Sequence, residues 1–226
     1  MATPEFDKGI LCLMDKPHLD IAFVSDVACP WCAIGLASLD KALARLGEEL
    51  EVKVTYEPFE LNPDMAAEGA EVVPYLTRKY GRTPEQIAQV QARIRESGAA
   101  VGFVFGPRPH VWNTFDAHRL LHWAQMEGRA GELKRALLQA YHGEGRNPGA
   151  RDVLLELSAK VGLDAERAKA ILDSDEYAAE VRAREHLWQR RGVNGVPFVL
   201  VNDTYAIEGA QPPEAFERAL RQVASR

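Results

Sequence analysis

Hydrophobic and polar positions alternate in two short segments near the start of the chain, and each pattern predicts a β-strand. Residues 19–25 contain so many apolar positions that a central strand, buried on both faces, is expected. Residues 52–56 alternate apolar with polar side chains, which predicts a second strand. Between them, leucines recur at spacings of three and four in residues 31–46, the period of an amphipathic helix ending at Gly47. The opening third is therefore predicted to be β-α-β.

The middle of the chain carries helical periodicity, with residues typical of helix starts. Thr83 is expected to cap a helix in which Pro84 takes the first position and Gln86 reaches back to the cap. Three further caps are predicted at Asn113, Asp164 and Ser174, the last for a long helix from about Asp175 to Arg191.

The last third returns to strand. The apolar run Phe198–Val201 is followed by Asn202-Asp203, a plausible two-residue turn into a strand over 204–207, which together predict a hairpin. Pro212-Pro213 then opens a helix with Phe216, Leu220 and Val223 facing inward. The two ends of the chain are thus expected to supply one sheet, with the helical block inserted between them.

Composition narrows the class of protein. Of 226 residues, 46% are hydrophobic, enough for a sizeable core, and the net charge of −6 disfavours a nucleic acid as partner. We find no stretch of about 20 apolar residues and no signal peptide, so we expect a cytoplasmic protein without a membrane partner. Three cysteines argue against a disulfide-stapled secreted domain, and Cys12 is interpreted as a bystander in an extension of residues 1–16.

The strongest chemical signal is Cys29-Pro30-Trp31-Cys32, at the junction of the first predicted strand and helix. A helix N-terminus carries partial positive charge, which favours a thiolate over a thiol. We expect Cys29 to be exposed as the nucleophile and Cys32 to be buried as the resolving thiol. Such a pair exchanges disulfides through a mixed disulfide that the second thiol releases.

The alternative for this motif is half of a zinc site, which needs two more ligands. There is no second CxxC. The pair His118 and His122 does not form the zinc-binding pattern HExxH, because Arg119 stands where the glutamate should be. The β-α-β context favours redox chemistry, so no metal is predicted. His118 and His122 are interpreted as lining a groove or packing under a loop.

Gly195-Val196-Pro197 precedes the apolar strand near the C-terminus. A proline at the first position of a strand costs no ladder hydrogen bond. Next to a CxxC motif, this turn would present the Val196 backbone to an extended substrate. A plain turn is the alternative interpretation.

The chain resembles the thioredoxin superfamily, and within it the DsbA-like proteins, most closely the FrnE-like branch related to 2-hydroxychromene-2-carboxylate isomerases. The resemblance extends from about Leu19 to the C-terminus. Its motifs are the segments 26–32, 58–63, 113–114, 117–120, 195–198 and 209–211. It implies an α/β thioredoxin-like fold, formed by residues 17–62 and 175–226, with an all-helical insertion over 63–174.

The resemblance also implies roles for residues around the motif. Pro197 is expected to be cis and to face Cys29 and Cys32, and Asn113 to reach the mouth of the site. Pro30, Trp31 and Val196 are expected to contact substrate. Asp26 is either a proton acceptor for Cys32 or a polar strand-end residue, and Phe59 lines a groove or packs in the core, as does Trp112; the sequence leaves these alternatives open.

Three functions remain. The first is a thiol–disulfide oxidoreductase acting on protein or small-molecule disulfides, as a monomer or homodimer, with no tightly bound cofactor and glutathione as a possible co-substrate. The second is a glutathione-dependent isomerase or transferase; the related isomerases typically carry serine in place of Cys29 and lack the second thiol, whereas this chain keeps both. The third is a non-catalytic module whose thiols sense redox state.

Overall fold

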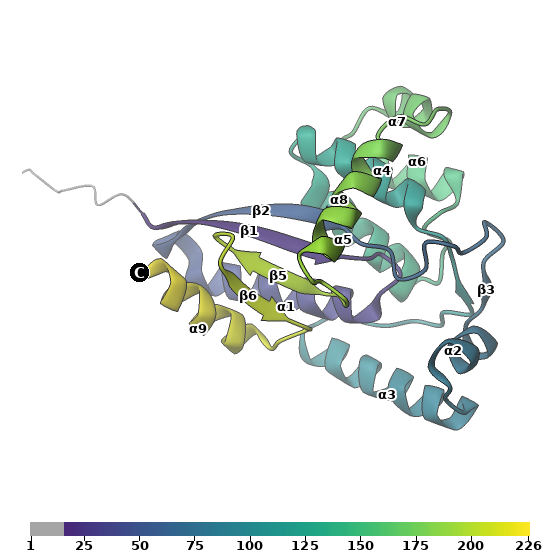
Figure 1. The fold of residues 1–226 in the computed structure, drawn as a ribbon, viewed down its shortest axis with the longest axis horizontal. Helices are drawn as coiled ribbons and strands as arrows, with labels where there is room; N and C mark the ends of the chain where they lie inside the picture. Colours follow the sequence, from purple (N-terminus) through teal and green to yellow (C-terminus); the bar gives the residue numbers. More distant parts are fainter. Residues whose placement is uncertain (1–15) are drawn as a thin grey trace, which may run out of the picture.

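The computed structural model describes residues 16–226, and its centre is a four-stranded mixed sheet drawn from both ends of the chain (Figure 1). The strand order is β2-β1-β5-β6, with β1 parallel to β2 and antiparallel to β5. The bounds are β1 His18–Ser25, β2 Glu51–Pro58, β5 Phe198–Val201 and β6 Tyr205–Glu208. The predicted strands and hairpin are confirmed, and so is the single sheet built from both chain ends.

Helices α1 (Pro30–Leu46) and α9 (Pro213–Ala224) pack on one face of this sheet. Leucines of α1 meet Phe216 and Leu220 of α9 and the buried side of β1 in one apolar cluster. Helix α8 (Ala178–Arg190) covers the other face, where Trp188 packs against Val24 and Phe198. Strand β1 is therefore covered on both sides, as its apolar sequence predicts.

The helices between β2 and β5 form two groups in Figure 1. One holds α2 and α3 beside the short β3–β4 ladder, and the other holds α4 to α7 with the π-helical turn η2. The expectation that this part of the chain is all-helical is therefore wrong, because residues 70–71 and 110–111 pair as antiparallel strands. The bounds of the helices are α2 Val72–Tyr80, α3 Pro84–Ala100, α4 Phe115–Met126, α5 Ala130–Leu138, η2 Gln139–Gly143, α6 Arg151–Lys160 and α7 Ala165–Leu172; the remaining short elements are η1 Gly47–Glu49, β3 Ala70–Glu71 and β4 His110–Val111. Helices α4 and α5 contact β2, so the second group is anchored on the sheet.

Two helix caps and one turn form where the sequence predicts them. Thr83 and Gln86 form the reciprocal capping box of α3, and Asp164 accepts the Arg167 N–H at the start of α7. At the hairpin, Asn202 and Asp203 both adopt left-handed backbone angles, which short polar side chains tolerate.

Two predicted caps are wrong. Thr114, not Asn113, is the N-cap of α4, and the Asn113 side chain accepts the Phe115 N–H from one position earlier. Helix α8 starts at Ala178 rather than near Asp175, because Arg119 takes up the main-chain carbonyls of Ser174 and Glu176. A helix that started near Asp175 would need these carbonyls for its own hydrogen bonds, but they accept from the buried guanidinium of Arg119 instead.

Candidate active site

Cys29 occupies the N-cap of α1, and Pro30 takes the first helical position. Its extended backbone (φ −89°, ψ 115°) turns the chain from β1 into the helix, and its N–H donates to the Asp26 carbonyl at 3.2 Å. Proline suits this place because the first helical N–H has no partner inside the helix. Cys32 lies one turn on and is fully buried, as expected. The expected exposure of Cys29 is wrong: only 3% of the residue is exposed, because the turn at Val196 lies against its thiol, although it borders an open cavity.

The two thiols, both free, differ in acidity. A hydrogen bond from Cys32 lowers the pKa of Cys29 below its ordinary value; burial opposes this, and the Cys32 and Trp31 main-chain amides add to it. Burial raises the pKa of Cys32 well above its ordinary value, and the hydrogen bond to Cys29 raises it further. The outer thiol is therefore the more readily ionised of the two, and the thiolate is the reactive form of a cysteine.

The Val196–Pro197 peptide bond is cis and lies beside the cysteines. The Cys29 thiol donates to the Val196 carbonyl at 3.5 Å. Pro197 also packs on α1 at Gly35, where an added Cβ would come within 2.9 Å of the proline Cγ. This contact brings a turn from the C-terminal part of the sequence next to the Cys29 thiol.

Asp26 is completely buried behind the motif and is held by four groups. Its carboxylate accepts the N–H of Ala28 at 3.0 Å, the N–H of Leu61 at 2.7 Å and the Thr114 hydroxyl at 2.8 Å, and His118 Nε2 lies at 3.3 Å. Burial by itself raises the pKa of Asp26, but His118 and the two amides bring it below its ordinary value. Asp26 is thus an ionised anchor joining β1, the segment after β2, and α4.

Lys134, from α5, is a buried cation on the same side as Asp26. It is 1% exposed, its ammonium donates to the Ser25 carbonyl at 3.4 Å, and within residues 16–226 no carboxylate lies within ion-pair distance of it. Burial lowers its pKa to about 8, although the charges of Cys32, Asp26 and Cys29 act in the opposite direction.

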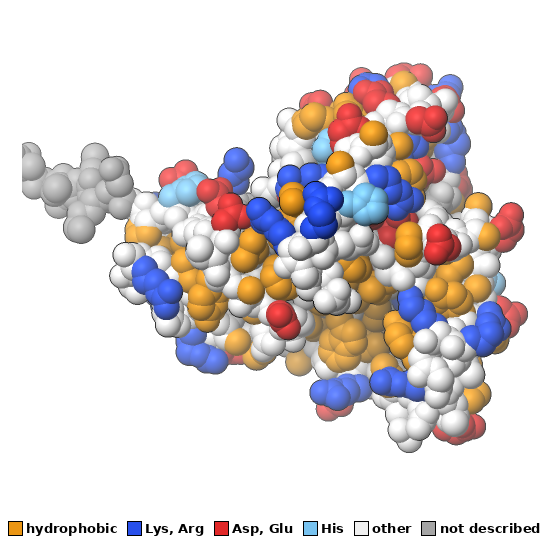
Figure 2. Space-filling model, viewed as in Figure 1, with side chains coloured by type: hydrophobic (Ala, Val, Ile, Leu, Met, Phe, Trp, Pro, Cys, Tyr) orange, Lys and Arg blue, Asp and Glu red, His pale blue; other side chains and the backbone are white. Residues whose placement is uncertain are grey.

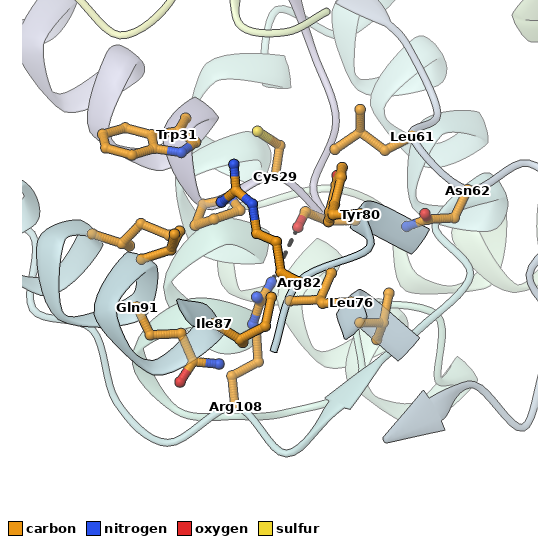
Figure 3. Close-up of a pocket in the computed structure, with 15 residues that line it drawn as sticks. Cys29, Trp31, Leu61, Asn62, Leu76, Tyr80, Arg82, Ile87, Gln91 and Arg108 are labelled. Carbon is orange, nitrogen blue, oxygen red and sulfur yellow. Dashed lines mark hydrogen bonds between the residues drawn. The ribbon is translucent and has the colours of Figure 1, made fainter. Parts of the chain in front are cut away.

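The cavity beside Cys29 has a volume of about 270 Å³ and opens between the start of α1 and helices α2 and α3 (Figure 3). Pro30 and Trp31 line it, and their expected contact with substrate stays a prediction. Figure 2 shows hydrophobic side chains gathered in the hollow where the sheet meets α3. The cavity therefore offers the outer thiol a route to a ligand.

Asn113 and Phe59 lie outside this cavity. The Asn113 amide donates to the Met65 carbonyl at 2.9 Å, so it ties the segment after β2 to the start of α4. Phe59 is 7% exposed and packs with Val24, Trp188 and Val193. Trp112 stacks on His110. Their substrate-contacting roles stay predictions, and for Phe59 the core alternative matches its packing.

Sequence reasoning missed the cationic and polar groups around the motif that come from the helical block. Arg82 and Arg108 line the cavity, and Thr114, His118 and Lys134 lie behind the cysteines. Thr114 and His118 stood within the motifs that carried the family resemblance. The other three have no signal in the sequence beyond their residue type.

Within residues 16–226 no cluster of three or more His, Cys, Asp or Glu side chains is arranged to hold a metal ion. In the same part of the chain, no helix combines the length and the apolar character that crossing a membrane requires.

Residues 20–221 match the family described as DSBA-like thioredoxin domain. The chain belongs to this family. A solved probable DsbA oxidoreductase from Streptomyces coelicolor is 37% identical to it, with 92% of this chain and 91% of that chain covered and a TM-score of 0.84. The expected fold, a DsbA-like thioredoxin fold with a helical insertion, is confirmed, and the family is one of disulfide-related oxidoreductases.

Two more distant structures share the fold. A 2-hydroxychromene-2-carboxylate isomerase is 17% identical, with 90% of this chain and 95% of that chain covered and a TM-score of 0.72. The cytosolic disulfide reductase DsbM from Pseudomonas aeruginosa, solved with GSH, is 20% identical, with 92% of this chain and all of that chain covered and a TM-score of 0.58. At these identities the likeness shows the fold alone; the narrower FrnE-like assignment stays a prediction.

Proposed function

We propose that this protein is a thiol–disulfide oxidoreductase that uses the Cys29–Cys32 pair. The observation that carries the proposal is the position of Cys29, which caps α1, borders an open cavity and touches the Val196 carbonyl, with Cys32 buried behind it. Two thiols of unequal acidity at one helix start are what a two-step exchange requires.

In the first step the Cys29 thiolate attacks a substrate disulfide. A bond forms between Cys29 Sγ and one substrate sulfur, the substrate S–S bond breaks, and the other sulfur leaves as a thiolate. Cys32 then loses its proton and attacks Cys29 Sγ, which forms the Cys29–Cys32 disulfide and releases the second substrate thiolate. The enzyme dithiol is oxidised by two electrons and the substrate is reduced; the same steps in reverse oxidise a substrate dithiol.

Two neighbouring groups support these steps. The main-chain amides at the start of α1 lower the pKa of Cys29, so they stabilise the attacking thiolate. Val196 and Pro197 would hold an extended substrate beside the sulfur. Of the two roles that the sequence leaves open for Asp26, we propose that of proton acceptor for Cys32; its lowered pKa makes it a weak base, so it would hold this proton only briefly.

Glutathione is a proposed co-substrate that would return the pair to its starting state, by analogy with the DsbM structure. A cytoplasmic location and a monomeric or homodimeric assembly also stay proposals. The division of the chain into a thioredoxin-like domain, residues 17–62 and 175–226, and an insertion, residues 63–174, is also a proposal. It follows the family resemblance. The isomerase alternative is less well supported, because both thiols are kept and lie at one site.

The test compares Cys29→Ser and Cys32→Ser in the reduction of a disulfide-bonded protein. We expect Cys29→Ser to fall to the uncatalysed rate. We expect Cys32→Ser to complete the first step only, so that a mixed disulfide of one substrate per chain accumulates in the mass spectrum. The matched control is Cys12→Ser, expected to keep full activity.

An isomerase of the glutathione type would respond differently, since it needs no second thiol. Full turnover by Cys32→Ser, or activity that survives in Cys29→Ser, would overturn the dithiol mechanism.

A further inference from the structure

The charged side chains that line the cavity at Cys29 are all positive. Its lining contains two arginines, Arg82 and Arg108, and no aspartate or glutamate, although the whole chain carries a net charge of −6. Within the described residues neither guanidinium has a carboxylate within ion-pair distance. A concave site lined by unpaired cations is suited to an anionic ligand.

The two arginines come from different segments and flank the nucleophile. Arg82 lies in the loop between α2 and α3, and Arg108 lies in the segment before β4. In Figure 3 the Arg82 side chain extends between Trp31 and Cys29, and the Arg108 side chain lies behind it, with its hydrogen bond to the Ala28 carbonyl drawn as a dashed line. Tyr80 lines the same cavity as Cys29, Arg82 and Arg108. Burial raises the pKa of Tyr80, and a charge on Cys29 raises it further. The positive charges of Arg82 and Arg108 lower the pKa of Tyr80 in turn.

Arg108 is held in place by its neighbours. Its Nη1 donates to the Ala28 carbonyl at 3.2 Å, next to the nucleophile in sequence, and its guanidinium lies over the Tyr141 ring at 5.4 Å. One edge of the guanidinium is therefore fixed, while its remaining N–H groups are available for a ligand. Arginine is suited to this task because its planar donors match a carboxylate.

Most of the remaining cavity wall is apolar, with Asn62, Gln91 and the Tyr80 hydroxyl as its uncharged polar groups. Trp31, Leu76, Ile87 and Ile94 supply aromatic and aliphatic surface, so the space would accept a ring or a short hydrocarbon rather than a strongly hydrated group. Its volume of about 270 Å³ fits one small organic group. The extended backbone of a protein substrate would instead lie along Val196 and Pro197.

We propose that the preferred substrates of this site are small organic disulfides with an apolar body and a carboxylate, which Arg82 and Arg108 bind while Cys29 attacks the sulfur. The inference rests on the proposed function and specifies its substrate class. The electron balance is that of the exchange above: the dithiol gives two electrons, and two carboxylated thiolates are released.

The test uses a matched pair of probes, dithiodipyridine and dithiodinicotinic acid, which share a pyridine disulfide and differ in the carboxyl group. Pre-reduced protein is mixed with each probe over a range of concentrations, and the release of thione in the single turnover is followed. The ratio of the second-order rate constants for the carboxylated and the neutral probe is then compared between variants. The difference in leaving group between the probes is the same in every variant, so it cancels in this comparison.

We expect Arg82→Gln and Arg108→Gln each to lower this ratio about tenfold, mainly by raising the half-saturating concentration of the carboxylated probe, because one charged hydrogen-bonding partner is lost. Arg82→Lys keeps the charge and should recover part of the ratio. Arg93→Gln on α3 makes the same charge change outside the cavity lining and should leave the ratio as in the wild type. Added salt should lower the wild-type ratio, because it screens exposed charges.

The outcomes separate the two proposals. If neither probe is reduced in a Cys29-dependent reaction, the proposed function fails. If the neutral probe is reduced and the ratio is the same in wild type, Arg82→Gln and Arg108→Gln, only the substrate inference is overturned. An equal loss in both variants for a protein disulfide and for both probes would also overturn it, since the arginines would then act on the site in general.

Discussion

At the scale of single residues, a buried carboxylate determines much of the chemistry around the CxxC motif. Asp26 has four hydrogen-bonding neighbours and stays ionised, because together they overcome the effect of burial. Its negative charge in turn raises the pKa of Cys29, against the helix-start amides that lower it. The charge of Asp26 thus adds to burial in raising the pKa of Cys29, while the hydrogen bond from Cys32 and the main-chain amides lower it.

Asp26→Asn should make Cys29 more acidic, because the opposing charge is removed while the amides remain. We expect the midpoint of Cys29 alkylation to move to lower pH by about half a unit to one unit. The resolving step should slow at the same time, because the proposed proton acceptor is lost. A pH series of alkylation rates measures the first effect, and decay of the mixed disulfide measures the second.

Asp40→Asn is the matched control, since it makes the same substitution at a partly exposed residue paired with Arg135. It should not move the alkylation midpoint. A midpoint for Asp26→Asn that stays in place or moves to higher pH would contradict this account of the pKa of Cys29.

At the scale of elements, helix α1 joins the nucleophile to the loop that faces it. The helix begins at Pro30, directly after Cys29, and one turn later Gly35 packs against Pro197. Glycine in a helix interior costs about 1 kcal/mol relative to alanine, so its presence here needs a packing reason. The close approach of the loop supplies that reason.

Gly35→Ala should displace the Val196–Pro197 loop, because the new Cβ would lie within 2.9 Å of the proline ring. Overpacking of this kind costs about 1–3 kcal/mol of stability, against a gain of at most about 1 kcal/mol in helix propensity. Turnover of an extended peptide disulfide should fall more than the rate of Cys29 alkylation, which does not need the loop. Urea unfolding and steady-state kinetics give the two readouts.

Gly195→Ala provides the comparison within the same loop, since a Cβ there would meet no atom within 4 Å. We expect it to be nearly silent in both assays. Equal behaviour of the two alanine variants would show that loop flexibility, rather than the contact with α1, controls turnover.

At the scale of the whole molecule, the helical block between β2 and β5 contributes polar side chains that lie behind Cys29 and Cys32. Thr114 and His118 of the α4 region reach Asp26, and Lys134 of α5 reaches the end of β1. Burying an ammonium without a carboxylate partner is unfavourable, because little in the interior replaces its hydration. The packing of the helical block against the sheet therefore buries a charge that lowers the free energy of unfolding by an amount that depends on pH.

Lys134→Met should stabilise the fold at pH 7, because the hydrocarbon part is kept and the buried charge is removed. The folded pKa of about 8 lies below the ordinary value of 10.5, so between these values the unfolded chain binds more protons and stability rises with pH. The cost of the charge is complete below pH 8 and fades toward pH 10.5. We expect a gain of about 3 kcal/mol at pH 7 that is largely absent at pH 10.

Urea unfolding of both proteins at the two pH values measures this difference. Lys160→Met, at an exposed position of α6, should change stability little at either pH. A gain for Lys134→Met that is the same at pH 7 and pH 10 would mean that shape, not charge, accounts for it.

The sequence by itself determined the strands, most helices and the reactive pair. Alternation at residues 19–25, the leucine spacing of residues 31–46 and the cap at Thr83 depend on neighbours along the chain, so local rules predict them. The CxxC at a strand–helix junction is local in the same sense. Where a distant side chain intervened, as Arg119 does before α8, the local prediction of the helix start was wrong.

Only the tertiary structure decided what surrounds the two sulfurs. Arg108, His118 and Lys134 lie about 80 to 109 positions from their partners near the motif, and nothing in the intervening sequence marks those contacts. The resemblance placed Pro197 opposite the cysteines, but its contact with Gly35 was not predicted, since the two meet because the last strands pair with β1. Local residue order produces the helix start that activates a thiol, whereas the cavity and its charges arise only when segments distant in sequence fold together.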